Sequence, residues 1–175
     1  NNRAYVTDSA MLLDWSDSTT YTYMHADSLW TEEIPYQIYT LAERDSILID
    51  SILTAQQPDT IWSDTTYQQL RAYRNVRIYR SDLQAVCDSA RYHGRDSIIT
   101  LFGMPICWNE ENQISADQID IYIKNEDIDY LYGQGNAIAI MQDGTNEFNQ
   151  MAGKEMYAYV RDGDVYLVDV RGNAE

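Results

Sequence analysis

Histidine, proline, cysteine and positive charge are all scarce in this chain of 175 residues. His25 and His93 are the two histidines, and the sequence contains no Gly-x-Ser-x-Gly motif. We therefore expect no Ser-His-Asp or Cys-His catalytic site. Twelve Lys and Arg against 28 Asp and Glu give a formal charge of −16. That charge argues against nucleic acid and against passive docking on an anionic bilayer, because both need a basic surface. No run approaches the roughly 20 apolar residues of a membrane span.

Close pairs of carboxylates are the remaining candidates for chemistry. Asp127 and Asp129, and likewise Asp162 and Asp164, are separated by one residue. They flank turn signals, however, and solvated carboxylates are the usual state in so acidic a chain. The segment 143–147 also lacks the spacing of an EF-hand loop. The sequence therefore predicts no catalytic residue, no metal site and no cofactor, and the chain is not expected to be an enzyme.

Fifteen tyrosines and three prolines favour β-strands. Ile119, Ile121 and Ile123 alternate with polar residues, as in a half-buried strand. Turn signals such as Asp143-Gly144 and Asp162-Gly163 separate such stretches. We predict short strands over most of the chain from residue 71 onward, and two more strands within 4–30.

A unit centred on the segment 112–121 recurs at least four times. Each copy has a small residue followed by a polar one, with an apolar residue two positions before it. The small residues are Ala26, Cys87, Ala116 and Gly153. Small side chains allow the backbone to turn against a neighbour, so we predict that these four form a structural corner between strands.

A repeated dipeptide also supports a repeat architecture. Gly135-Asn136 recurs as Gly172-Asn173 after 37 residues, the same interval as from Ala116 to Gly153. Such a period is typical of stacked layers of strands, each of which buries its apolar edge on the next. The chain is therefore expected to be a fragment of a longer repeat protein.

The segment 31–69 breaks this spacing. It is rich in Asp, Ser, Thr and Gln, and it holds two of the three prolines. We predict an insertion here, in which 41–55 forms an amphipathic helix or irregular structure; a strand is the competing interpretation.

Several segments resemble a known family, among them 75–92, 105–119 (PICWNEENQISADQI), 149–156 and 169–174. They are similar to the OstA-like proteins of Bacteroidetes-type Gram-negative bacteria, in the LptA/OstA lipopolysaccharide-transport superfamily. The resemblance covers 71–175 well and 4–30 more loosely. It implies a mostly β fold: an open β-jellyroll of stacked, bent antiparallel strands in a V-shaped groove. Residues 1–175 would form one such segment, with a variable insertion at about 31–69.

The resemblance also implies a function. It indicates a non-enzymatic periplasmic module of outer-membrane biogenesis that binds or transports lipopolysaccharide or a related lipid, in the periplasm or at the outer membrane. Its protein partners would be other lipopolysaccharide-transport jellyrolls, or a second copy, joined by pairing of edge strands. The alternative is a structural β-repeat that associates by strand addition without binding lipid.

Apolar residues that flank the corner are the candidates for lining a lipid groove. They are Ile78, Leu83, Ile114, Ile119, Ile121, Ile140, Met151 and Met156. The same residues fit a packed core equally well, and the residue pattern leaves both interpretations open. In a strand that starts at Arg74, Arg74 and Arg80 share one face, which makes them candidates for a groove rim that meets a lipid phosphate. Ion pairing with the surplus carboxylates is the favoured interpretation.

The two cysteines are both expected to face inward. Cys87 holds the corner position, and Cys107 aligns with Ile78 of the preceding strand in the repeat register. A disulfide needs Cα atoms about 4.4–6.8 Å apart. One disulfide and two buried thiols both remain open, and the thiols are slightly favoured.

Replacing Ala116 by Leu tests the corner. The larger side chain is expected to overpack it and to lower the free energy of unfolding by about 1–3 kcal/mol. The same change at Asp117, which is expected to be exposed, should matter little. Urea denaturation of both variants measures the difference, and equal tolerance of the two changes would contradict the corner.

Overall fold

The computed structural model describes residues 3–14, 21–41, 60–109, 112–143 and 147–173. Its regular elements are strands, which confirms the prediction of a mostly β fold. They are β1 (Arg3–Asp14), β2 (Thr22–Leu41), β3 (Thr60–Tyr79), β4 (Gln84–His93), β5 (Ile98–Phe102), β6 (Ile106–Asn109), β7 (Asn112–Ser115), β8 (Gln118–Lys124), β9 (Asp127–Asp143), β10 (Glu147–Arg161) and β11 (Asp164–Arg171). Within the described ranges there is no helix that could cross a bilayer.

All pairings in the sheet are antiparallel, and the order is β1-β2-β3-β4-β5-β8-β9-β10-β11. The short strands β6 and β7 complete a second path. β4 pairs with β5 through its C-terminal half and with β6 through its N-terminal half. β9 likewise pairs with β8 and then with β7. Each long strand thus runs through two regions of the sheet, and each short strand lies in only one of them.

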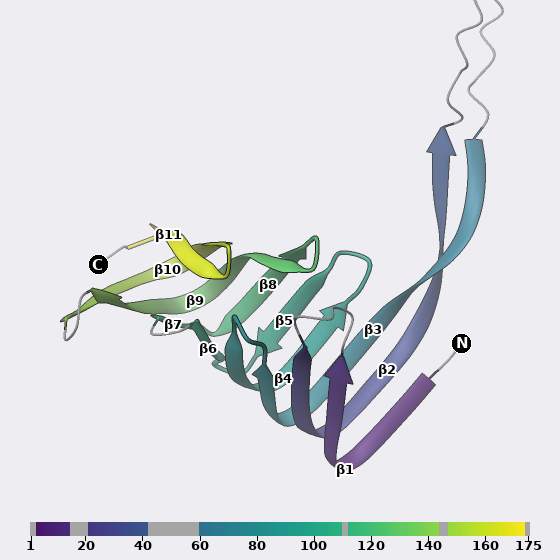
Figure 1. Cartoon of the computed structure of the whole chain (residues 1–175), viewed down its shortest axis with the longest axis horizontal. Helices are drawn as coiled ribbons and strands as arrows, with labels where there is room; N and C mark the ends of the chain where they lie inside the picture. The colour runs from purple at the N-terminus through teal and green to yellow at the C-terminus, as the bar shows by residue number, and fades with distance from the viewer. Residues whose placement is uncertain (1–2, 15–20, 42–59, 110–111, 144–146, 174–175) are drawn as a thin grey trace, which may run out of the picture.

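The long strands bend sharply where these two regions meet (Figure 1). At this level the register shifts between β1 and β2, β2 and β3, β3 and β4, and β9 and β10. Every second layer carries two consecutive residues with φ between 46° and 79°. These pairs are Asp8-Ser9, Arg74-Asn75, Gly103-Met104, Gly135-Asn136 and Gly172-Asn173. Opposite them stand Ala26-Asp27, Cys87-Asp88, Ala116-Asp117 and Gly153-Lys154. The four small residues singled out in the sequence therefore occupy equivalent positions at one bend.

Hydrogen bonds at the bend explain why a polar residue follows the small one. The amide of Asn136 donates to both carboxylate oxygens of Asp117, at 3.2 and 3.0 Å. Asn75 donates in the same way to Asp27, at 3.0 Å. Gly135, with φ +72°, has no room for a side chain, since a Cβ would lie 2.3 Å from an Asp117 carboxylate oxygen. At these two layers, left-handed backbone on one strand and a carboxylate on the next together hold the bend.

The bend divides the sheet into two arms. The long arm comprises 3–7, 28–41, 60–73, 89–102, 118–134 and 155–171, and the short arm comprises 10–14, 22–25, 76–87, 105–109, 112–115, 137–143 and 147–152. Their inner faces share one hydrophobic core. The short arm contributes Met24, Ile78 and Ile114, and the long arm contributes Leu101, Ile119 and Met156. The two arms are in close contact at the bend, where a Cβ on Gly133 of the long arm would lie 3.3 Å from the Cβ of Ala116.

The segment 31–69, predicted to be an insertion, forms a β-hairpin where the structure describes it. β2 and β3 pair without interruption from Ser28–Tyr73 out to Leu41–Thr60. β1 reaches only Glu32 and β4 only Gln69, so the outer part of this hairpin is a two-stranded ribbon that extends from the sheet (Figure 1). The prediction of a helix or irregular structure was made for 41–55, of which the structure describes only Leu41, the last residue of β2. Residues 42–59 lie outside the described part of the chain.

The structure supplies a better control for the Ala116→Leu test. Ala116 is 5% exposed and faces the opposite arm. Asp117 is hydrogen-bonded to Asn136, so its replacement would remove contacts at the bend as well. Ala152 lies next to Gly153 on β10 and points away from the inner face, because side chains alternate along a strand. Ala152→Leu makes the same chemical change outside the bend, and its free energy of unfolding should stay close to that of the unmodified chain.

Candidate functional site: the cleft between the arms

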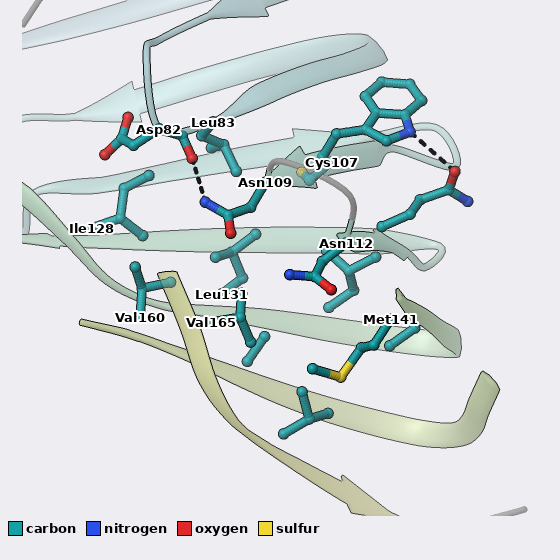
Figure 2. A pocket seen from close by; sticks show the side chains of 16 residues that line it. Asp82, Leu83, Cys107, Asn109, Asn112, Ile128, Leu131, Met141, Val160 and Val165 are labelled. Atoms are coloured by element: carbon teal, nitrogen blue, oxygen red, sulfur yellow. Dashed lines mark hydrogen bonds between the residues drawn. The ribbon is translucent and has the colours of Figure 1, made fainter. Parts of the chain in front are cut away.

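At the open end of the two arms, opposite the bend, lies an apolar cavity of about 30 Å³ (Figure 2). We call it the cleft. Its apolar lining is Leu83, Cys107, Trp108, Ile114, Ala139 and Met141 from the short arm and Ile128, Leu131, Ala158, Val160, Val165 and Val168 from the long arm. The short arm also contributes the polar residues Asp82, Asn109, Asn112 and Gln113. A volume of this size holds little more than a water molecule. The cleft is therefore apolar on both sides and nearly filled by its own side chains.

Six of the eight residues expected to line a groove are buried, each at most 7% exposed: Ile78, Leu83, Ile114, Ile119, Ile121 and Met156. Leu83 and Ile114 line the cleft, whereas Ile119 and Met156 do not border it and belong to the core. Met151 is partly buried against that core. The structure thus divides this set into a packed interior and a smaller part that reaches the cleft.

Ile140 is the exception among these candidates. Its neighbours on β9, Ala139 and Met141, both line the cleft. Because side chains alternate along a strand, Ile140 points to the opposite face, where it is opposite Gln113 and Gln150 in the neighbouring strands. It does not contribute to the cleft.

Several residues of the cleft were missed by reasoning from the repeat. Ile128 and Leu131 lie on β9, Val160 on β10, and Val165 and Val168 on β11. Their signal in the sequence is an apolar pattern near the turns 125–126 and 162–163, distant from the small corner residues. Only the folding of one arm over the other brings these turns to the short arm.

The two candidate rim arginines do not share a face. Arg74 has φ 62° and belongs to one of the left-handed pairs, which breaks the alternation on which the prediction relied. It is exposed, 3.7 Å from a carboxylate oxygen of Asp27. Arg80 lies in the turn after β3 and forms two hydrogen bonds with the carboxylate of Asp82, at 2.8 and 3.0 Å. Both arginines therefore form ion pairs within the chain.

Polar contacts join the tips of the two arms at the mouth of the cleft. Arg80 of the short arm donates through Nη1 to the backbone carbonyl of Glu126 in the β8–β9 turn, at 3.1 Å. Asn109, at the end of β6, donates through Nδ2 to the carbonyl of Asp82 and to that of Gly163 in the β10–β11 turn, each at 2.6 Å. The Oδ1 atom of Asn109 is buried and has no hydrogen-bond partner in the described part of the chain. Figure 2 shows this oxygen facing the cleft.

The two thiols are free, as the favoured interpretation of the sequence had them. Burial raises the pKa of Cys87 to about 12, and burial also raises the pKa of Cys107. Both thiols are therefore protonated at neutral pH, the state in which cysteine is a poor nucleophile and metal ligand. Among the described residues, His, Cys, Asp and Glu form no cluster of three or more that could hold a metal ion.

Much of the tyrosine content lies on the outer face of the long arm, away from the cleft. Tyr122 stacks on Tyr130, with ring centroids 4.2 Å apart, and Tyr132 stacks on Tyr157 at 4.4 Å. Partial burial among these rings raises the pKa of Tyr130 and of Tyr132 to about 12. Cross-strand aromatic pairs of this kind stabilise the sheet and make the tyrosines a structural feature of β8–β11.

Comparison with known proteins adds no relative, since no family model, no curated protein and no solved structure matches this chain. The resemblance to OstA-like proteins stays a prediction from the sequence.

Proposed function

We propose that this chain is a non-enzymatic, exported module of outer-membrane biogenesis that binds the acyl chains of lipopolysaccharide or a related lipid. The observation that carries the proposal is the apolar lining of the cleft on both arms, at the end where side-chain contacts join the arms. An open β-jellyroll of the OstA-like kind is the finer description of the fold that goes with this function.

The lining of the cleft suits a hydrocarbon ligand. Val160, Val165 and Val168 face Leu83 and Met141 across the cavity. Transfer of an acyl chain from water to such a surface is favoured by about 0.8 kcal/mol per buried methylene group. Met141 adds an unbranched, flexible side chain that can adapt to the shape of a ligand. Because the closed cleft has room for little more than a water molecule, binding requires that the arms separate.

The acidic charge of the chain indicates that it binds the acyl chains of the lipid rather than a phosphorylated head group. The formal charge of the chain is −16, and the two candidate rim arginines are already paired with Asp27 and Asp82. A lipid phosphate would have to displace these carboxylates. The head group is therefore expected to stay in solvent outside the mouth.

Photo-crosslinking amino acids at Met141 and at Val165 test the proposal with native lipopolysaccharide. Both side chains line the cleft, so both positions should label the lipid. Ile140 and Tyr166 are the matched controls, since each is adjacent to a test position and points to the opposite face. Labelling is measured by mass shift on a gel. A folded protein that labels at neither Met141 nor Val165, or equally at the controls, would contradict lipid binding in the cleft.

A second candidate function, strand addition without lipid, is favoured by the edges of the sheet. Within the described residues, β1 pairs only with β2, and β11 only with β10. Both edge strands expose large apolar side chains: Tyr5, Val6, Met11 and Leu13 on β1, and Tyr166 and Leu167 on β11. Unpaired edges with apolar side chains are templates for pairing with another chain.

Proline variants of the two edges test this candidate. If β1 of one copy pairs with β11 of the next, the unmodified chain should associate with increasing concentration in the absence of lipid. Val6→Pro or Leu167→Pro should each block one edge, since proline cannot donate to a ladder. Each variant alone should then stay monomeric, because every contact needs one free β1 and one free β11. An equal mixture of the two variants has one such pair of free edges and should stop at dimers, and sedimentation velocity measures the difference. An unmodified chain that stays monomeric at all concentrations would rule out self-association through these edges.

A further inference from the structure

The mouth of the cleft is held differently from the bend. At the bend, the long strands β1, β2, β3, β4, β9 and β10 run from one arm into the other, so the backbone itself joins the arms. At the mouth, the side chains of Arg80 and Asn109 reach from the short arm to backbone carbonyls of the long arm. Separation of the arms at the mouth breaks side-chain contacts and leaves the sheet intact. Separation at the bend would require the long strands themselves to straighten.

We propose that Arg80, Asp82 and Asn109 form a latch on the carbonyls of Glu126 and Gly163, and that release of this latch admits an acyl chain into the cleft from the side. This inference rests on the proposed function, because it concerns how the ligand of that cleft enters. It assigns to Arg80 a role in access to the cleft in place of contact with a lipid phosphate.

Asp82 organises the latch. Its carboxylate holds the guanidinium of Arg80 in place through two hydrogen bonds, and its backbone carbonyl accepts a hydrogen bond from Asn109. A single turn of the short arm thus positions both donors that reach the long arm. The Arg80 and Asp82 side chains are only 11% and 19% exposed, so solvent screens their pairing less than it screens the pair of Arg74 and Asp27.

Asn109 lowers the free-energy cost of opening the mouth. Its Nδ2 has two acceptors, but its Oδ1 is buried against the apolar cleft without a donor. A buried acceptor without a partner destabilises the state that contains it, and contact with water removes that penalty. Opening of the mouth therefore loses the hydrogen bond to Gly163 and gains hydration of Oδ1, which partly offsets the loss.

The latch stands directly at the cavity that it would control. Asp82 and Asn109 themselves line the cleft, next to Leu83, Ile128 and Val165. Release of Glu126 and Gly163 would move the β8–β9 and β10–β11 turns away from the short arm and connect this lining to solvent. An acyl chain could then enter along its length, without threading through an end.

Stopped-flow fluorescence with cis-parinaric acid, an apolar chain that fluoresces when buried, tests the latch. Asn109→Ala and Arg80→Gln should each raise the rate constant for probe entry by about two- to tenfold, the effect of removing one hydrogen bond from the closed state. Gln37→Ala and Arg171→Gln are the controls. Gln37→Ala removes one side-chain hydrogen bond outside the mouth, to Asp64 at 2.9 Å, and Arg171→Gln removes two, to Asp169 at 3.0 and 2.7 Å. Neither control should change the entry rate.

The outcomes separate the latch from the proposed function. Probe binding with the same entry rate in all four variants overturns the latch and leaves the cleft as a lipid site. No saturable binding by the unmodified chain or by any variant overturns both. Far-ultraviolet circular dichroism checks the fold of each variant, and because Asn109→Ala and Arg80→Gln alter different bonds, either one alone decides the question if the other fails to fold.

Discussion

The rest of the structure depends on one bend that is repeated in register across the sheet. On alternate layers two consecutive residues adopt left-handed backbone, and the layers between them carry a small residue followed by a polar one. Neither kind of layer forms the bend alone, since the left-handed pair Gly135-Asn136 is fixed by the carboxylate of Asp117 on the next strand. Small residues are required inside the bend because the two arms meet there, at Ala116 and Gly133.

In a sheet folded in this way, the arms are held together more firmly at the bend than at the mouth. Its closed end is held by the long strands that continue from one arm into the other and by a core of buried residues such as Leu101, Ile119 and Met156. Its open end is held by side-chain contacts from Arg80 and Asn109. The apolar residues between these ends form a packed core near the bend and line a small cavity near the mouth. One continuous apolar surface therefore stabilises the fold near the bend and, in our proposal, binds lipid near the mouth.

The sequence was informative where a local rule sufficed. Ala26, Cys87, Ala116 and Gly153 could be aligned because size and polarity recur at one position of each repeat. The alternation of Arg74 with Arg80 failed because a left-handed pair interrupts the strand. The ribbon of β2 and β3 was missed because the polar composition and the prolines of 31–69 outweighed the alternation of Ile34, Tyr36 and Ile38. The mouth could not be predicted, since Asn109 and Gly163 are brought together only when one arm folds over the other.

The central claim is that the arms separate at the mouth, and not at the bend, when a lipid enters. Double electron–electron resonance measures it directly, with spin labels at the exposed residues Ser81 and Asp127 on opposite sides of the mouth, and with Cys87 and Cys107 replaced by Ala. Labels at the exposed residues Asp88 and Lys154 report on the bend. Native lipopolysaccharide should lengthen the Ser81–Asp127 distance and leave the Asp88–Lys154 distance unchanged. Bound lipopolysaccharide with an unchanged Ser81–Asp127 distance would contradict the account.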